Sequence, residues 1–493
     1  MYKKVFINTA AQILSKAGTA LISILLLSIL TNYLTQELFG LYSKVYNYLG
    51  IFAFLADLGL YTITIREITK NSNDTKNIVS NVMTLRTILG IIIIVLSVGI
   101  AYFLPGYNSK IAIISIFIIS LFTLVSLINS SVLALMQAKL KMEFSLFSAI
   151  LGKLATFVGI LLTVFIFFKK DIISDYSFPF YFIMLSGLLG ITINTLMNYF
   201  YTKKLCDIGF SFDYKYMKHI FKISLPYGLA LFLSVVYFKV DIVLLSIIEP
   251  EKLSNYSIAL YSLPMKIVEV LMVIGGFYLN SILGELSKNF ELKKHTEINS
   301  ILNISFKLLF SFSLFLLVSG TLFRNNIIEI VANREYITSP GHIYSSSSVF
   351  FIVLLVLVFY FISNLFIYIL ISSNNEKKLL KINIIVALFN IIGNILIIPK
   401  YSFMGSGIVT VLSQLLLLII GYFETKKITK FIFPIKYIVV NIIFNAGIYI
   451  LISNIMQTYT LGLYFDILCY GFMLGIIYLS FYYYLFKKNK FIV

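Results

Sequence analysis

Long apolar runs separated by short polar segments follow one another along the whole chain. A helix needs about 20 apolar residues to cross a hydrocarbon core of roughly 30 Å. Fourteen such runs occur, near residues 9–30, 40–62, 79–103, 111–135, 144–168, 177–201, 223–248, 255–284, 301–322, 342–372, 379–399, 402–423, 432–455 and 463–486. The stretch Ile91–Leu96 is apolar without interruption, whereas a membrane barrel strand alternates apolar and polar residues. The pattern predicts an all-α polytopic membrane protein with 14 transmembrane helices.

Composition excludes a soluble protein. Of the 493 residues, 59% are hydrophobic and 12% are charged, with a mean hydropathy of +0.95. A soluble domain has roughly 45–50% apolar and about 25% charged residues. Lys3 and Lys4 precede the first apolar run as in a secretory signal, but Lys16 interrupts that run and no small-residue cleavage site ends it. We therefore expect a retained first helix.

The charge balance predicts the orientation. The chain has 39 basic and 21 acidic residues, a formal net charge of +18. In a membrane protein, cytoplasmic anchoring charge explains such an excess, so nucleic acid is not an expected partner. With the N-terminus inside, 25 Lys and Arg residues fall in cytoplasmic segments and 7 in outside loops, which predicts that both termini are cytoplasmic. Cys206 and Cys469 are too scattered for a disulfide framework or a metal cluster, and no cofactor is expected.

A weak internal repeat suggests two lobes. Segment 37–43 matches segment 251–257 in its Glu, Tyr and Ser residues, at an offset of 214. This offset equals six spans, so both copies cross the membrane in the same direction, as in a parallel repeat with substrate between the lobes. The predicted parts are a six-helix lobe at 1–213, a second at 214–426, and a helical hairpin at 427–493.

Charged residues within the spans are the candidates for function, since each is costly there without a partner or water. Near the span ends, snorkelling to the interface is the alternative for Lys16, Lys44, Arg86 and Lys307. Deeper in the spans, a cavity-facing role or an interhelical ion pair is expected for Lys153, Lys239, Asp241, Lys266 and Glu269.

Helical spacing restricts how these deeper charges pair. Lys266 and Glu269 are three residues apart, so they share a helix face and can neutralise each other. Lys239 and Asp241 are two residues apart and cannot meet on one face. Asp241 must therefore find its partner on another helix or carry a proton.

Three further residues could end or bend a span. Asp57 lies near the cytoplasmic end of the second span, where it can cap the helix or pair with Arg66. Pro226 and Pro264 lie inside the seventh and eighth spans, where each removes a backbone hydrogen bond and can act as a hinge. A packing kink is the plainer interpretation of both prolines.

Several short motifs carry a family resemblance. They are Leu34-Thr35-Gln36-Glu37-Leu38-Phe39-Gly40-Leu41-Tyr42, Asp57-Leu58-Gly59-Leu60 with Arg66-Glu67, Gln137-Ala138 with Lys141-Met142, Tyr256-Ser257-Ile258-Ala259, and Pro399 with Gly405-Ser406-Gly407 and Thr410. With 14 spans and a basic interior, the chain resembles the polysaccharide repeat-unit (O-antigen type) flippases of the multidrug/oligosaccharidyl-lipid/polysaccharide exporter superfamily.

The resemblance implies that the chain moves a polyprenyl-diphosphate-linked oligosaccharide from the inner to the outer leaflet of the bacterial cytoplasmic membrane by alternating access. Membrane lipids and a polysaccharide polymerase are the other implied partners. It implies a cationic substrate cavity lined by Lys16, Lys44, Lys239 and Lys266, with Lys153 as a fifth member. It also implies coupling to H+ or Na+, for which the candidate acids are Asp241, then Glu269, then Asp57.

Other functions make different predictions. A cation-coupled multidrug exporter would have about twelve spans and a net negative cavity, whereas an exporter of a peptidoglycan precursor would also need a basic cavity. A membrane-embedded polysaccharide polymerase would need a large external loop carrying Arg or His, but the loop at 323–341 holds only Arg324 and Arg334. A structural scaffold would not explain the basic residues within the spans.

Overall fold

The computed structural model describes residues 2–170, 175–338, 343–373, 375–459 and 462–487, and these residues form helices and connecting segments without any strand. The first half contains α1 (Tyr2–Tyr33), α2 (Gln36–Asp57), α3 (Leu60–Lys70), η1 (Ser72–Asp74), α4 (Thr75–Phe103), α5 (Lys110–Ala138), α6 (Met142–Leu161), η2 (Leu162–Phe167) and α7 (Ser177–Lys203). The second half contains α8 (Tyr214–Ile248), α9 (Glu251–Glu291), α10 (His295–Leu322), α11 (Arg324–Val331), α12 (Glu335–Thr338), α13 (Ser346–Ser372), α14 (Glu376–Lys426), α15 (Ile435–Thr458) and α16 (Leu463–Lys487).

The number of membrane-spanning helices agrees with the sequence pattern. Within the described ranges, 13 helical segments are long and apolar enough to cross a membrane. One of them, Lys377–Lys426, contains two helices, because Ser402 has the non-helical angles φ 51° and ψ −143°. Ser402 lies where the eleventh and twelfth predicted spans meet. The prediction of fourteen membrane helices is therefore confirmed.

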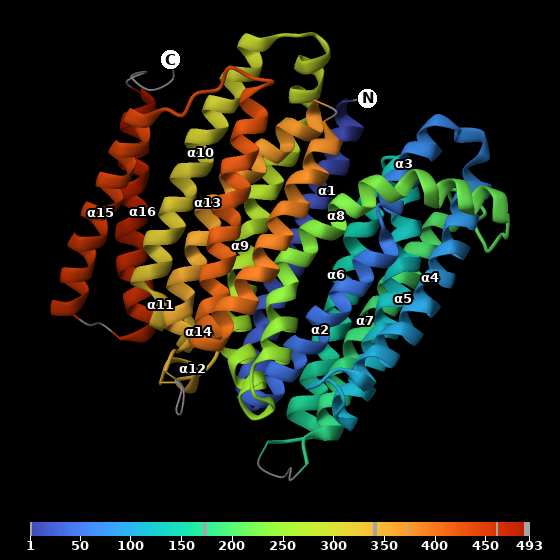
Figure 1. Cartoon of the computed structure of the whole chain (residues 1–493), viewed down its shortest axis with the longest axis horizontal. Helices are drawn as coiled ribbons and strands as arrows, with labels where there is room; N and C mark the ends of the chain where they lie inside the picture. Colours follow the sequence, from blue (N-terminus) through green and yellow to red (C-terminus); the bar gives the residue numbers. More distant parts are fainter. Residues whose placement is uncertain (1, 171–174, 339–342, 374, 460–461, 488–493) are drawn as a thin grey trace. The chain divides into compact units, whose positions relative to one another are not determined.

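The contacts divide the chain into two compact units, residues 1–259 and 260–493. Unit 1 contains α1 to α8 with the first turns of α9, and within it α4, α5, α6 and α7 run alongside one another (Figure 1). Helix α8 belongs to unit 1 because it packs against α2, α3 and α4. The lobes predicted at 1–213 and 214–426 are defined by the repeat rather than by packing, and they remain a prediction.

The second predicted span is interrupted near one end. Helix α2 ends at Asp57, Leu58 and Gly59 have left-handed backbones with φ of 36° and 75°, and α3 begins at Leu60. A side chain on Gly228 of α8 would overlap the main chain of Leu58. The predicted second span therefore corresponds to α2 followed by α3, and the backbone handedness reverses between them where the chain meets α8.

The two helices that contain Pro226 and Pro264 are not interrupted. Pro226 is exposed within the 35-residue α8, and Pro264 is buried within the 41-residue α9. Both helices continue on either side of the proline, so neither residue ends a span. The break next to Pro226 lies instead in the neighbouring segment at Leu58 and Gly59.

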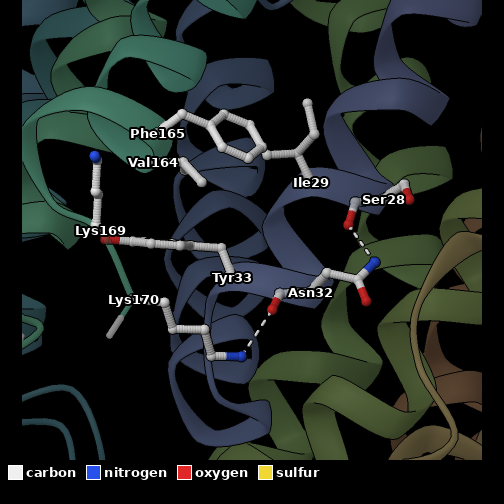
Figure 2. Close-up of a pocket in the computed structure, with 8 residues that line it drawn as sticks. All are labelled: Ser28, Ile29, Asn32, Tyr33, Val164, Phe165, Lys169 and Lys170. Atoms are coloured by element: carbon white, nitrogen blue, oxygen red, sulfur yellow. Dashed lines mark hydrogen bonds between the residues drawn. The ribbon is translucent and has the colours of Figure 1, made fainter. Parts of the chain in front are cut away.

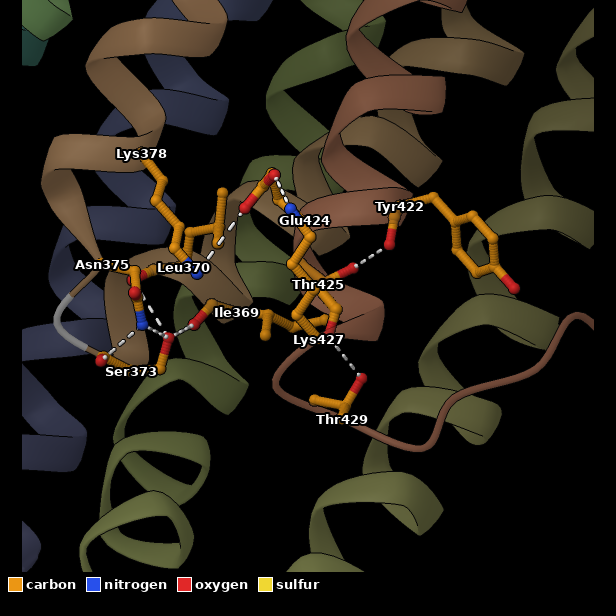
Figure 3. A network of polar contacts seen from close by, with 10 residues as sticks. All are labelled: Ile369, Leu370, Ser373, Asn375, Lys378, Tyr422, Glu424, Thr425, Lys427 and Thr429. Atoms are coloured by element: carbon orange, nitrogen blue, oxygen red, sulfur yellow. Dashed lines mark hydrogen bonds and ion pairs between the residues drawn. The ribbon is translucent and has the colours of Figure 1, made fainter.

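A polar network fixes the end of unit 2 where α13 leads into α14 and α14 ends. The Glu424 carboxylate pairs with Lys427 and, at 3.6 Å, with Lys378 (Figure 3). Asn375 donates through Nδ2 to the Ser373 carbonyl at 3.0 Å, and so closes the turn before α14. These contacts tie the first turn of α14 to its last turn.

The hairpin of α15 and α16 is joined to α10 by buried polar side chains. The hydroxyls of Ser311 and Tyr437 lie 2.6 Å apart, and Tyr482 donates to Asn441 Oδ1 at 2.8 Å. The Lys307 ammonium lies 5.7 Å from the centre of the Tyr437 ring. Because Lys307 is buried, the alternative that it snorkels to the interface does not describe it. The hairpin is thus held by hydrogen bonds as well as by apolar packing.

Candidate functional site

One face of α2 carries most of the functional geometry in unit 1. Glu37, Gly40, Lys44 and Asn47 follow one another at intervals of three or four residues, and this spacing places them on the same side of a helix. Thr35 starts the helix by accepting a hydrogen bond from the Leu38 backbone N–H at 3.3 Å. This cap fixes the residue at which α2 begins, and so fixes which side chains lie on this face.

Lys44 is buried beside a cavity at the end of unit 1 that holds the α1–α2 turn, which we call the pocket end. Its ammonium donates to the Gly106 carbonyl at 2.6 Å and lies 5.2 Å from the centre of the Tyr107 ring. Only 1% of Lys44 is exposed, so the alternative that it snorkels to the interface does not describe it. Burial raises the pKa of the Tyr107 phenol, which keeps this ring uncharged beside the ammonium.

The cavity has a volume of about 360 Å³ and carries both signs of charge. Its lining includes Lys44, Lys252, Ser109 and the two carboxylates of Glu37 and Glu251. Both carboxylates interact electrostatically with Lys44. The positive charge is therefore partly balanced at this end of α2.

The two segments that match in sequence meet at the pocket end. Gly40 lies in the first segment, and Asn255 lies in the second, in the first turns of α9. A Cβ atom on Gly40 would overlap the Asn255 carbonyl oxygen, so the two main chains are in direct contact. Only glycine permits this approach of α2 to α9.

Lys239 lies deeper in unit 1 and is held by the same helix. Its ammonium donates to Asn47 Oδ1 at 3.2 Å, and its methylene stem packs over Gly50, where a Cβ would lie 3.0 Å from Lys239 Cδ. None of the ion pairs in the described part of the chain includes Lys239. A half-buried cation with an amide as its hydrogen-bond partner can still neutralise an anion.

The other end of α2 carries a buried ion pair. Arg86 of α4 is fully buried, pairs with Asp57, and donates to Ser131 Oγ of α5 at 3.1 Å. Neither the snorkelling expected for Arg86 nor the pairing of Asp57 with Arg66 describes this arrangement. The pair joins three helices directly beside the break at Leu58.

The remaining predicted site residues lie in varied surroundings. In unit 1, Lys16 is exposed on α1, Lys153 is half-buried on α6, and Asp241 is fully buried on α8. In unit 2, Lys266 is half-buried and Glu269 is exposed, both on α9. Lys44 lies on α2, and Lys239 of α8 contacts the same face of α2 through Asn47. The other candidates are distributed over α1, α6, α8 and α9.

A second cavity, of about 530 Å³, lies between the end of α1 and the π-helical segment η2 (Figure 2). Tyr33 donates to the Phe168 carbonyl at 2.6 Å, and Lys170 donates to the Asn32 carbonyl at 3.0 Å. Because Lys170 is engaged by the C-terminal turn of α1, this cavity offers less free positive charge than its two lysines suggest. No group of three or more His, Cys, Asp or Glu side chains in the described ranges could hold a metal ion.

Sequence comparison identifies the family. The profile of the polysaccharide biosynthesis protein family matches residues 3–283, which is more than half of the chain. The chain belongs to this family. The MatE profile matches residues 226–396 of the same chain. No curated protein sequence gives a significant match.

Solved structures share the fold of this polysaccharide biosynthesis family member. The lipid II flippase MurJ, in an inward closed conformation, has a TM-score of 0.76 at 16% identity, covering 98% of this chain and 100% of its own. An inward-facing multidrug resistance MATE family transporter of the MOP superfamily has a TM-score of 0.63 at 12% identity, covering 83% and 97%. A MOP superfamily transporter from Pyrococcus furiosus has a TM-score of 0.53 at 11% identity, covering 86% and 93%.

Family and fold together make the chain a multi-pass membrane protein of the polysaccharide biosynthesis family, with the fold that the MurJ and MATE structures share. The sequence of this polysaccharide biosynthesis family member indicated Lys44 and Lys239 as candidate site residues. It did not indicate their hydrogen-bond partners, which are Gly106 for Lys44 and Asn47 for Lys239. Asn47 is detectable as a polar residue in step with Lys44 on one helix face. Gly106 contributes only a carbonyl group, which no sequence pattern identifies.

Proposed function

We propose that the chain is a flippase that moves a polyprenyl-diphosphate-linked oligosaccharide repeat unit from the inner to the outer leaflet of the bacterial cytoplasmic membrane. In this proposal both termini are cytoplasmic. The diphosphate group binds in a cationic cavity of the protein while the lipid tail stays in the bilayer. A polysaccharide polymerase that uses the delivered repeat unit is the proposed partner.

The observation that carries the proposal is the Lys239–Asn47 contact. The Asn47 amide carries no charge to oppose that of Lys239, and a lysine within a span is costly unless it is paired or reaches water. A diphosphate is a strong acceptor of charge-assisted hydrogen bonds, and it could take the place of the Asn47 oxygen. Lys44, Lys153, Lys16 and Lys266 are the other proposed contacts along the path.

The extent of the structural likeness favours a lipid-linked cargo. MurJ, named as a lipid II flippase, covers 98% of this chain, whereas the MATE multidrug transporter covers 83%. The match over nearly the whole chain includes more of the helices than a multidrug transporter fold accounts for. The family, named for polysaccharide biosynthesis, supports the same class of cargo.

The pocket end supplies a proposed gate. Gly40 brings α2 against Asn255 of α9 with their main chains in contact, so passage at this end requires the two helices to separate. In the proposed topology this end faces the outside of the cell. Alternating access would then open and close this contact as the two predicted lobes rock.

Coupling to H+ or Na+ is proposed to act through acidic residues in the spans. Asp241, fully buried on α8 two residues from Lys239, is the first candidate, and Glu269 is the second. Asp57 is the third, since its carboxylate is engaged by Arg86. If Asp241→Asn left both transport and its ion dependence unchanged, the assignment of Asp241 would be wrong.

The deciding experiment uses a strain that lacks the gene. Polyprenyl-linked glycans are extracted and analysed by mass spectrometry after leaflet-selective labelling. A complete repeat unit trapped on the inner leaflet supports the flippase if the wild-type gene releases it and Lys239→Ala does not. Repeat units that reach the outer leaflet unpolymerised would instead identify a polymerase.

A peptidoglycan precursor is the second candidate cargo, favoured by the likeness to MurJ over the full length of that protein. The same strain distinguishes the two cargoes. Accumulation of a disaccharide-peptide lipid, with normal surface polysaccharide, would support the precursor. Normal lipid-linked glycans with raised sensitivity to cationic drugs would instead support a multidrug exporter.

A further inference from the structure

The segment joining α7 to α8 is pinned along α4 by alternate residues. The backbone N–H groups of Gly209 and Ser211 donate to Ser80 Oγ at 3.2 Å and to Thr84 Oγ1 at 3.1 Å. The N–H of Asp213 donates to Asn81 Oδ1 at 2.7 Å. Every second backbone group is thus turned toward α4, as in an extended chain with one face against a support.

The residues that alternate with these anchors carry exposed aromatic side chains. Phe210, Phe212 and Tyr214, which we call the aromatic row, are 66%, 71% and 64% exposed. The hydrogen bonds to α4 hold the row in place, so its exposure follows from the geometry of the segment. A fixed apolar row of this kind needs an apolar environment.

Exposed lysines flank the aromatic row on both sides. Lys215, Lys218 and Lys222 follow at spacings of three and four residues, which places them on one face of α8. On the other side, Lys203 ends α7 and Lys204 follows it. The two acids of the segment are already engaged. Asp207 pairs with Lys76 at 3.0 Å, which lowers the pKa of the Asp207 carboxyl, and Asp213 caps α8 by accepting from the Tyr216 N–H at 3.1 Å.

We propose that this segment is a binding surface for anionic phospholipid headgroups, with the aromatic row inserted at the membrane interface and the α8 lysines on the lipid phosphates. The segment joins two membrane-spanning candidates, Ser177–Lys203 and Tyr214–Ile248, so it lies where hydrocarbon gives way to headgroups. Aromatic rings favour that depth, and lysines there attract anionic lipid. The proposal goes beyond transport and does not depend on the identity of the cargo.

The surface has a consequence for the connection between the two predicted lobes. It holds the chain that leaves the first lobe and enters the second at the start of α8. A membrane rich in anionic lipid would anchor this connection, so lipid composition would set how easily the start of α8 moves. Phosphatidylglycerol is the simplest probe of the required chemistry.

The absence of tryptophan from the sequence allows a direct test. Phe212→Trp introduces the only indole, and Val95→Trp, at a 67% exposed position within α4, serves as the lipid-buried reference. In vesicles of phosphatidylcholine and phosphatidylglycerol, lipids brominated near the headgroup should quench the Phe212→Trp variant more than lipids brominated deep in the tail. The Val95→Trp variant should show the opposite order. Quenching of Phe212→Trp by aqueous iodide alone would overturn the proposal.

A second measurement tests whether the α8 lysines bind anionic lipid. After purification from mixed vesicles, the triple variant Lys215→Gln, Lys218→Gln and Lys222→Gln should carry about one third, or less, of the phosphatidylglycerol bound to the wild type. The matched variant Lys288→Gln, Lys293→Gln and Lys294→Gln removes three exposed lysines from another connection, and should retain the wild-type amount. Equal loss from both triple variants, or no loss from the first, would overturn a site at α8. Retention of a protein partner by the wild type, abolished by Phe212→Ser with no change in bound lipid, would overturn it in favour of a protein surface.

Discussion

Gly40 of α2 lies directly against the main chain of Asn255 in α9, so that any side chain at residue 40 would overlap the Asn255 carbonyl. The two residues belong to the two segments that match in sequence at an offset of 214. In the predicted parallel repeat, these segments are the corresponding turns of the two copies. The main-chain contact at the pocket end of unit 1 is therefore made between the two segments that match in sequence.

We predict that Gly40→Val opens this end. The added side chain must separate α2 from α9, and overpacking of this kind costs about 1–3 kcal/mol. In a chain with Cys206 and Cys469 replaced by serine, the probe is Leu41→Cys, at a buried position in the lining of the cavity. Labelling of this cysteine by a water-soluble maleimide should rise several-fold when Gly40→Val is added.

The control for this prediction is Gly99→Val. A Cβ on Gly99 meets no other atom within 4 Å, so the same substitution there should leave the labelling of Leu41→Cys unchanged. An equal rise from both valine variants would show that the effect is general loosening. It would then say nothing about the contact with Asn255.

We predict an asymmetry between the two partners of the buried ion pair. Asp57→Ala leaves the fully buried Arg86 without its counter-charge and should cost about 3–5 kcal/mol of stability. Arg86→Met should cost less, because the Asp57 side chain is 25% exposed and can hydrate. The double variant should recover much of the loss. Thermal unfolding of the purified variants in detergent measures all three, and equal losses for the two single variants would contradict the argument.

We predict that Lys239→Ala lowers transport by at least about tenfold while the protein still folds. Two opposite unit charges about 4 Å apart interact by several kcal/mol at an effective dielectric constant near 20, and tenfold corresponds to about 1.4 kcal/mol. Delivery of labelled lipid-linked oligosaccharide across proteoliposome membranes is the measurement. Lys76→Ala is the control, since Lys76 is 66% exposed and pairs with Asp207 on the surface. A loss of the same size from Lys76→Ala would remove the reason to place the anion at Lys239.

We predict that Asn441→Leu loosens the hairpin of α15 and α16. The substitution removes the acceptor of the Tyr482 hydroxyl in a fully buried position, and such hydrogen bonds in membranes contribute about 0.6–1.7 kcal/mol. Limited proteolysis of the segment before α15 should therefore proceed faster. Asn454→Leu, on the same helix at an exposed position, should have no effect. Unchanged proteolysis of Asn441→Leu would show that apolar packing alone holds the hairpin.

The hydrophobic pattern predicted the helices well because the bilayer imposes their length. It predicted even the separation of the eleventh and twelfth spans, which the structure shows as a non-helical backbone at Ser402. It missed the break at Leu58 and Gly59, because those residues are apolar or neutral and the handedness change depends on Gly228 of a distant helix. Hydropathy records how much of a segment is apolar and says nothing about which neighbour it meets.

The charged residues show the same limit. Sequence position placed Arg86 and Lys44 near helix ends, where snorkelling was one of the alternatives, yet both are buried. Their partners are Asp57, which ends another helix, and the carbonyl of Gly106 in a loop. Distance from a helix end along the chain does not reveal whether a neighbouring helix covers that end.

The α2 face has a thermodynamic consequence. Gly40, Lys44 and Asn47 are carried by one continuous helix, so a tilt of α2 that separates Gly40 from Asn255 also moves the hydrogen-bond partner of Lys239. Two equilibria that share a rigid element must be linked, and the linkage acts equally in both directions. An anion that displaces Asn47 from Lys239 would then weaken the Gly40 contact by the same factor by which closing that contact weakens the anion's binding. Loading and opening would be one reversible process, and a closed pocket end would be the state of low affinity.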